Sequence, residues 1–188
     1  MKLGKTWVVW LSMFLMWGAQ AAGIADQLKG RDHVLLMRHA YAPGVGDPPG
    51  YVLERCETQR ILNQEGKNQA VRIGRWLRTQ RIEKALVSTS PWCRCKQTAE
   101  LLNVGPVTIE PALASFFDEP QLAAARNSRL QSFIAHALRS KGDQALILVT
   151  HHVNILEFMG QNIGSGDMVL ARVNPDGHLV DYKLFRSP

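Results

Sequence analysis

Two arginines and two histidines carry the clearest chemistry in this 188-residue sequence. Arg38 and His39 stand together directly after a continuous apolar run, and His151 follows a second such run. Arg94 comes shortly after a shorter predicted strand, residues 85–90, near the start of a predicted helix. A guanidinium group and the backbone N–H groups at a helix N-terminus both bind anions. These residue types therefore predict a site for an anion, with histidine beside it.

The runs that precede these residues are predicted to be buried strands. Residues 34–37 are continuously apolar, and residues 145–150 are apolar up to Thr150, as in parallel strands covered on both faces; residues 85–90 and 107–109 indicate two shorter strands. In an open α/β sheet, ligands bind at the carboxyl ends of the strands. The arginine–histidine pair and the second histidine are therefore expected at a ligand-binding edge.

Helices are predicted between the strands. Asn63 is suited to cap a helix whose buried side carries Gly66, Ala70, Ile73 and Leu77. Further helices are expected from Pro91, in a first turn, to about Leu102 and over residues 121–140, and a β-hairpin is expected over residues 168–173 and 178–185. Strands that alternate with helices predict an α/β fold: a three-layer α/β/α sandwich with a mainly parallel central sheet.

The N-terminus has the pattern of a secretory signal peptide. Lys2 and Lys5 precede an apolar segment that ends at Trp17, and small residues follow it. The segment is too short to span a bilayer comfortably, so an uncleaved membrane anchor is the weaker alternative. We expect residues 1–21 to be removed and residues 22–188 to form one domain, with membrane contact through the signal peptide alone.

The charge balance points to an anionic partner. The formal net charge is +6, and removal of the two N-terminal lysines lowers it to +4. A moderately basic exported protein suits an anionic substrate or a membrane-surface environment better than nucleic acid, and the sequence contains no nucleic-acid-binding motif. We therefore expect a periplasmic or secreted protein without a nucleic-acid partner.

Four stretches resemble motifs of the histidine phosphatase superfamily, which has the phosphoglycerate-mutase-like fold, and they occur in family order. They are Leu36-Met37-Arg38-His39-Ala40, Arg60-Ile61-Leu62-Asn63-Gln64-Glu65-Gly66, the arginine motif Ser88 to Ala99, and Val149-Thr150-His151. The second of these is a weaker family feature. One motif alone indicates little, whereas three in order at predicted strand ends are specific. The chain is similar to a small, exported branch of that superfamily.

The resemblance implies phosphohistidine chemistry. His39 would be the nucleophile that receives the phosphoryl group. Arg38, Arg94 and His151 would surround the phosphoryl oxygens, and Arg60 would be a further substrate-binding cation. This arrangement requires no metal and no other cofactor. The expected enzyme is a histidine phosphatase, a phosphoric monoester hydrolase.

The sequence departs from the family pattern at the general acid. Ser115 occupies the position at which mutase-like relatives carry a glutamate, and Asp118 and Glu119 follow in the same loop. Acid-phosphatase-like relatives carry an aspartate directly after the second histidine, where this chain has His152. Asp118 or Glu119 is the first candidate and His152 the second. A reaction without a dedicated acid, which a good leaving group permits, is the third.

Three cysteines in an exported chain predict one disulfide and one free thiol. Cys93 and Cys95 are too close along a helix to pair, which leaves Cys56 bonded to one of them. Relatives often carry a small buried alanine at the position of Cys95, so the resemblance favours Cys56–Cys93. A metal site built from Cys93, Cys95, His151 and His152 is the weaker alternative, because its spacing matches no common zinc frame.

The predicted function is that of an exported, metal-independent phosphomonoester phosphatase. Size and export resemble the lipopolysaccharide-core heptose phosphatases of the superfamily, which implies a small phosphorylated substrate such as a cell-envelope sugar phosphate. The missing acid supports an alternative, a phosphate-ester-binding protein of the same fold that is catalytically impaired. A phosphohistidine-protein phosphatase fits the size, but phosphorelay substrates are cytoplasmic. A mutase is disfavoured because no insertion is long enough to form a cap.

Overall fold

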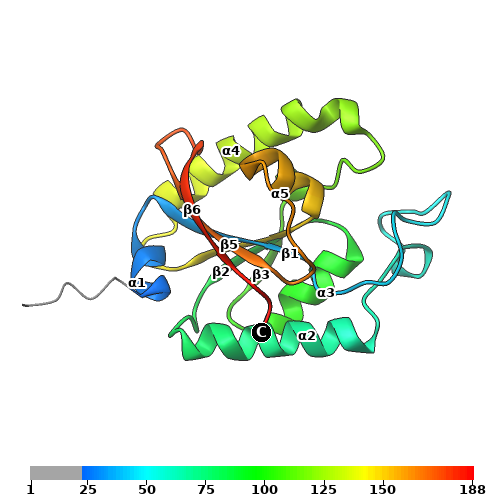
Figure 1. Ribbon diagram of the computed structural model, residues 1–188, viewed down its shortest axis with the longest axis horizontal. Helices are drawn as coiled ribbons and strands as arrows, with labels where there is room; N and C mark the ends of the chain where they lie inside the picture. The colour runs from blue at the N-terminus through cyan, green and yellow to red at the C-terminus, as the bar shows by residue number, and fades with distance from the viewer. Residues whose placement is uncertain (1–22) are drawn as a thin grey trace, which may run out of the picture.

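Six strands form one sheet in the order β3-β2-β4-β1-β5-β6 (Figure 1). The computed structural model describes residues 23–188, so the expected signal peptide and its cleavage point lie outside the described residues. The strands are β1 His33–Arg38, β2 Leu86–Thr89, β3 Val107–Ile109, β4 Leu146–Thr150, β5 Met168–Val173 and β6 Leu179–Phe185. β1 to β4 run parallel, β5 pairs antiparallel with β1, and β6 pairs antiparallel with β5, which confirms the mainly parallel sheet.

Helices cover both faces of this sheet. They are α1 Ile24–Lys29, α2 Gln64–Thr79, α3 Cys93–Leu102, α4 Ala123–Ser140 and α5 His152–Met159, with short 3-10 turns at Cys56–Thr58, Pro111–Leu113 and Pro120–Leu122. Helices α2 and α3 lie on one side and α4 and α5 on the other (Figure 1), so the three-layer α/β/α sandwich is confirmed. Within residues 23–188, none of the helices has the length and apolarity that a membrane span requires.

Alternation along the strands builds a separate core on each face. Leu35 and Met37 of β1 face the side of α2 and α3, whereas Val34 and Leu36 face the side of α4 and α5. The same alternation holds in the neighbouring strand β4, all of whose residues are buried. Burial of both faces explains why these strands are continuously apolar in the sequence.

Helix α2 forms as the sequence predicted. The side chain of Asn63 caps it by accepting a hydrogen bond from the N–H of Gly66, and the expected inner side is buried. Gly66 also has a packing role, because a Cβ at this position would overlap the carbonyl oxygen of Tyr41. The start of α2 can therefore lie directly against the loop that follows β1.

The strand order decides which motifs meet. Strand β4 lies between β1 and β2, and the carboxyl ends of the three strands are aligned in the sheet register. Arg38 is opposite Thr150, and Thr89 is opposite Val149. The carboxyl ends of three adjacent parallel strands therefore form one edge. The residues that follow them are neighbours in space although they are far apart in the sequence.

Three local details differ from the sequence-based prediction. Pro91 lies before α3 rather than in its first turn, because Trp92 is extended (ψ 138°) and is the N-cap. Helix α4 begins at Ala123, since the preceding residues form a 3-10 turn. The short helices α1 and α5 were not expected, and their six and eight residues are too few to show a clear helical period.

Candidate active site

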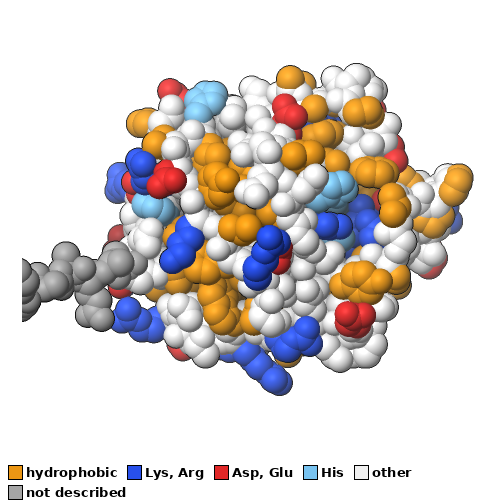
Figure 2. All heavy atoms as spheres, viewed as in Figure 1, with side chains coloured by type: hydrophobic (Ala, Val, Ile, Leu, Met, Phe, Trp, Pro, Cys, Tyr) orange, Lys and Arg blue, Asp and Glu red, His pale blue; other side chains and the backbone are white. Residues whose placement is uncertain are grey.

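Side chains from three adjacent strand ends line one cavity of about 210 Å³. Arg38 and His39 come from the end of β1, His151 from the end of β4, and Arg94 from the first turn of α3, which follows β2. The lining is completed by Gly44, Val45, Gly46, Asp47, Arg60, Ser115, Phe117 and His152. Figure 2 shows arginine and histidine side chains gathered at a hollow, with apolar side chains around it. The structure thus brings together most of the residues that the sequence predicted, namely Arg38, His39, Arg60, Arg94, His151 and His152.

His39 is held with one ring nitrogen free. Its Nδ1 lies 2.7 Å from the carbonyl oxygen of Ala40, which can only accept, so Nδ1 carries the proton and donates it. Nε2 is then the nitrogen with the lone pair. The residue is 1% exposed, and burial, followed by the charge of Arg94, holds the pKa of His39 well below its ordinary value. A neutral imidazole at neutral pH is the form that acts as a nucleophile.

His151 lies beside His39, with their ring centroids 5.6 Å apart in an edge-on arrangement. Its Nε2 is 2.7 Å from the hydroxyl of Ser90, and its Nδ1 is 3.5 Å from Nη2 of Arg94. A guanidinium only donates, so Nδ1 faces it as an acceptor and Nε2–H donates to Ser90. Burial, and then the charge of Arg94, also lowers the pKa of His151 well below its ordinary value.

Two buried guanidinium N–H groups at this site have no partner within residues 23–188. They are the Nε–H groups of Arg38 and Arg94. The other end of Arg38 is fixed, because its Nη1 donates to the carbonyl oxygen of Ile163 at 2.9 Å. Buried donors are nearly always paired in folded proteins, so two unpaired ones beside a cavity indicate a place for an acceptor.

The loop after β1 closes one wall of the cavity. Arg60 lines the cavity, as expected of a substrate-binding cation. Two of its donors, however, hold the loop itself. Its Nε donates to the carbonyl oxygen of Gly46 at 2.8 Å, and its Nη1 donates to that of Ala42 at 2.6 Å. Asp47, from the same loop, forms a buried ion pair with Arg94 at 2.8 Å. Sequence reasoning missed Asp47, because it lies in a Gly/Pro-rich loop without a motif around it.

The three candidate acids lie in different surroundings. Asp118 and Glu119 are exposed and are not among the residues that line the cavity, although Phe117 beside them is. His152 lines the cavity, with its ring centroid 5.7 Å from that of Phe117. Burial, followed by the charge of Arg38, lowers the pKa of His152 and favours its neutral form. By position alone, His152 is the candidate nearest to the reacting group.

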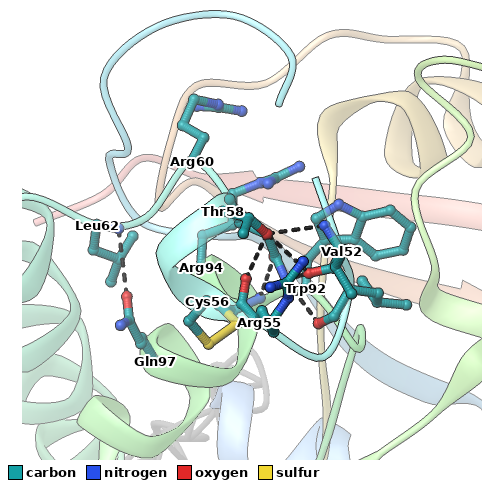
Figure 3. The surroundings of a disulfide bond; sticks show 12 residues. Val52, Arg55, Cys56, Thr58, Arg60, Leu62, Trp92, Arg94 and Gln97 are labelled. Atoms are coloured by element: carbon teal, nitrogen blue, oxygen red, sulfur yellow. Dashed lines mark hydrogen bonds between the residues drawn. A yellow bond between two sulfur atoms is a disulfide. The ribbon is translucent and has the colours of Figure 1, made fainter. Parts of the chain in front are cut away.

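Cys56 and Cys93 form a disulfide, with their Cα atoms 5.6 Å apart, which confirms the predicted pair (Figure 3). Cys95 is free and buried, and burial raises the pKa of its thiol to about 12. The alternative metal site loses Cys93 to the disulfide. Within residues 23–188, no group of three or more His, Cys, Asp or Glu residues is arranged to hold a metal ion.

Comparison with known families covers the part of the chain that supplies the arginines of this site. Residues 34–117 match the model of the histidine phosphatase superfamily (branch 1), and this range contains Arg38, His39, Arg60 and Arg94. The second histidine, His151, lies beyond the matched range. A search of curated protein sequences gave no significant match.

Solved structures share the fold at low sequence identity. The protein histidine phosphatase SixA complexed with tungstate has a TM-score of 0.52 and 18% identity, over 81% of this chain and 94% of that one. Mycobacterial glucosyl-3-phosphoglycerate phosphatase with inorganic phosphate has a TM-score of 0.60 and 14% identity, over 84% and 97%. Phosphoserine phosphatase from Entamoeba histolytica with 3-phosphoglyceric acid has 0.57 and 13%, over 79% and 93%.

The family match, the shared fold and the grouping of the motif residues at one sheet edge agree with one another. The chain belongs to the histidine phosphatase superfamily.

Proposed function

We propose that this protein is a metal-independent phosphomonoester phosphatase that works through a phosphohistidine on His39. One observation carries the proposal. A buried, neutral histidine with a free Nε2 shares a cavity with two guanidinium groups whose Nε–H donors are buried and unpaired within the described residues. A phosphoryl group supplies both the electrophile for the histidine and the acceptors for the donors.

The reaction has two steps. Nε2 of His39 attacks phosphorus, so that an N–P bond forms while the P–O bond to the leaving group breaks and the leaving group takes up a proton. Water then attacks the phosphohistidine, the N–P bond breaks, and inorganic phosphate and neutral histidine are released. Arg38 and Arg94 bind the phosphoryl oxygens and stabilise the charge that they carry in the transition state.

The charge of the cavity suits a simple monoester. Three arginines and one aspartate line it, and the lowered pKa values of its histidines keep these neutral. The formal charge of the lining is therefore close to that needed to balance a phosphomonoester dianion, the dominant form above a pH of about 6. Val45 and Phe117 are exposed apolar residues of the lining. The part of the substrate that carries the phosphoryl group would therefore contact apolar side chains at the mouth of the cavity.

The central experiment replaces the nucleophile. His39→Ala should abolish hydrolysis of an aryl phosphate, whereas His136→Ala, at an exposed histidine of α4, should leave it unchanged. Quenching the wild type with labelled substrate should trap a phosphoenzyme that is stable to alkali and labile to acid. Chelators should have no effect. Full activity of His39→Ala, or activity that is lost with chelator and restored by zinc, would refute the proposal.

A second candidate is a phosphate-ester-binding protein that has lost turnover. Its basis is that Asp47 is the only carboxyl group among the lining residues, and that group is engaged in an ion pair. Such a protein would bind inorganic phosphate or vanadate but would release no phosphate from any ester. A panel of aryl phosphates, phosphorylated sugars, lipid-core fragments and nucleotides decides between the two and narrows the substrate class, for which we favour a small cell-envelope sugar phosphate.

The site of action is proposed to be the periplasm or the exterior of the cell. Support comes from the N-terminal sequence pattern and from the disulfide, a bond that persists in oxidising compartments. Mass spectrometry of the protein from its native host should find an N-terminus at or near Ala22. Recovery of the chain with Met1 intact on membranes would replace export by membrane anchoring.

A further inference from the structure

Asp47 is a negatively charged side chain in a cavity that otherwise carries cations. Its side chain is 3% exposed, and that of its partner Arg94 is 4% exposed. Both carboxylate oxygens contact the same nitrogen, Nη1 of Arg94, at 2.8 and 3.0 Å. The indole N–H of Trp92 donates to Oδ2 at 3.1 Å, and the backbone N–H of Arg60 donates to Oδ1 at 2.9 Å. The two-step reaction described above assigns no task to this group.

The backbone around Asp47 is shaped to bring it inward. Gly44 and Gly46 have φ values of +91° and +68°, in the left-handed region that glycine tolerates best. The loop is then held from outside by Arg60 and by the Cys56–Cys93 disulfide, which links it to the start of α3 (Figure 3). Several independent contacts therefore hold the carboxylate of Asp47 against the guanidinium group of Arg94.

The nitrogen of Arg94 that Asp47 contacts decides which edge of the guanidinium group stays available for another acceptor. In a guanidinium group, Nε–H and one N–H of Nη2 point the same way and form the edge that binds an oxyanion through two parallel hydrogen bonds, whereas Nη1 lies outside that edge. Asp47 occupies Nη1 alone, so it leaves the Nε–Nη2 edge of Arg94 open. The Nε–H of that edge is the buried, unpaired donor noted above, and Nη2 lies next to His151.

We infer that Asp47 is a positioning residue, which fixes the guanidinium of Arg94 so that its Nε–Nη2 edge faces the phosphoryl group. This inference rests on the proposed phosphatase function. Asp47 acts through Arg94 and not on the substrate: N–H donors from Arg94, Trp92 and Arg60 occupy its carboxylate oxygens, which act as acceptors. It also offsets one positive charge of the cavity, so that the site matches a monoester rather than a more highly charged ester.

The test is a double-mutant cycle between Asp47 and Arg94. Asp47→Asn keeps the size of the side chain but removes its charge, and should lower kcat/KM for an aryl phosphate by about 10- to 100-fold through misplacement of Arg94. Arg94→Lys keeps the charge but has no Nε–Nη2 edge. If Asp47 acts through that edge, Asp47→Asn should cost less than about 3-fold in the Arg94→Lys background. Equal losses in the two backgrounds would show a purely structural role and overturn the inference.

Three further variants separate positioning from general loop stability. Glu54→Gln, at an exposed acid of the same loop, should leave kcat/KM unchanged. Trp92→Phe removes the indole donor but keeps the Asp47–Arg94 pair, so its loss should be much smaller than that of Asp47→Asn. Asp47→Glu keeps the charge and shifts the carboxylate, and should lower kcat/KM at least 3-fold while the melting temperature is retained. A Trp92→Phe loss equal to that of Asp47→Asn, or a fully active Asp47→Glu, would contradict positioning.

Binding of inorganic phosphate, measured by calorimetry, keeps this test independent of turnover. The cycle should show the same coupling between Asp47 and Arg94 in phosphate affinity as in kcat/KM. A wild-type protein that binds phosphate but hydrolyses no ester would refute the phosphatase function, while the coupling in affinity would still decide the role of Asp47. Coupling absent from both affinity and kcat/KM, in an active wild type, would refute the positioning role alone.

Discussion

The protonation state of His39 depends on residues that surround it rather than on histidine itself. An unperturbed histidine titrates near pH 6.5, so about a quarter would be protonated at pH 7. Burial and the nearby charge of Arg94 both disfavour the imidazolium, and both act only in the folded protein. The environment thus keeps His39 in the neutral form that the proposed nucleophile requires, while the Nδ1 bond to Ala40 leaves Nε2 as the nitrogen with the lone pair.

A prediction about pH follows from the lowered pKa of His39. Because the folded protein binds this proton less tightly than a free histidine does, kcat/KM should stay constant as the pH falls to 6.5 and should decrease only at lower pH. The measurement is a pH profile of kcat/KM, corrected for the second ionisation of the substrate phosphate. Arg94→Met, which removes the second-largest cause of the shift, should move the acid limb to higher pH. A wild-type limb at or above pH 6.5 would contradict the prediction.

The general acid can be identified by its dependence on the leaving group. An acid matters most when the leaving group is poor, so the loss should be much greater for an alkyl phosphate than for an aryl phosphate. Because His152 lines the cavity and Asp118 and Glu119 do not, we now expect the larger selective loss for His152→Ala. Asp118→Asn and Glu119→Gln should affect both esters equally and weakly. A selective alkyl-ester loss in either carboxyl variant would assign the acid to that residue instead.

At the scale of elements, the loop between β1 and α2 is held to α3 by hydrogen bonds as well as by the disulfide. The side chain of Gln59 accepts a hydrogen bond from the N–H of Cys93 at 3.0 Å, and the hydroxyl of Thr58 is hydrogen-bonded to Val52 (Figure 3). These contacts lie within or next to the turn that carries Cys56. They should keep the loop close to α3 even when the covalent link is broken.

Reduction of the disulfide is therefore expected to affect the site more than the fold. Cys56 and Cys93 are 37 residues apart, for which the entropy of loop closure sets an upper bound of about 4 kcal/mol on stability. Kinetics in reductant should show a several-fold decrease in kcat/KM, with faster proteolysis of the loop and cooperative unfolding retained. The Cys56→Ser/Cys93→Ser variant is the control, since reductant should not change it. An unchanged kcat/KM in the reduced wild type would show that the bridge has no influence on the site.

Across the whole molecule, Lys141 ties helix α1 to the connection between α4 and β4, two segments that are distant in the sequence. It is 3% exposed, and its ammonium group donates to the carbonyl oxygens of Leu28, Lys29, Gly142 and Gln144. Two of these acceptors belong to the C-terminal end of α1, and the others to the connection between α4 and β4. A buried charge is tolerated here because backbone carbonyls replace the water that it loses.

Removal of this ammonium group should destabilise the protein without a direct effect on catalysis. Lys141→Met leaves buried carbonyl oxygens without their donor, for which we expect a loss of about 2–3 kcal/mol in the free energy of unfolding. Denaturant unfolding measures the loss, with Lys67→Met at an exposed position of α2 as the matched control. Equal stability of the two variants would show that α1 is held by its apolar contacts alone.

The sequence by itself determined the main strands and the grouping of the motif residues at their ends. Residues 34–37 and 145–150 were recognisable because burial on both faces removes polar residues from a strand, and this effect is local. Arg38, His39, Arg94 and His151 follow such runs or the turn after them, so the rule that strand ends carry ligands was enough to group them. The pairing of Cys56 with Cys93 needed the family resemblance as well.

Only the tertiary structure decided how these residues are set for reaction. The neutral state of His39 depends on burial and on Arg94, and the placement of Arg94 depends on Asp47, 47 residues earlier in the chain. Asp118 and Glu119 are next to the lining residue Phe117 in sequence and yet lie outside the cavity lining. Such facts depend on which loops meet across the sheet edge. The contacts between these loops are set by packing between distant segments, which no local pattern of residues encodes.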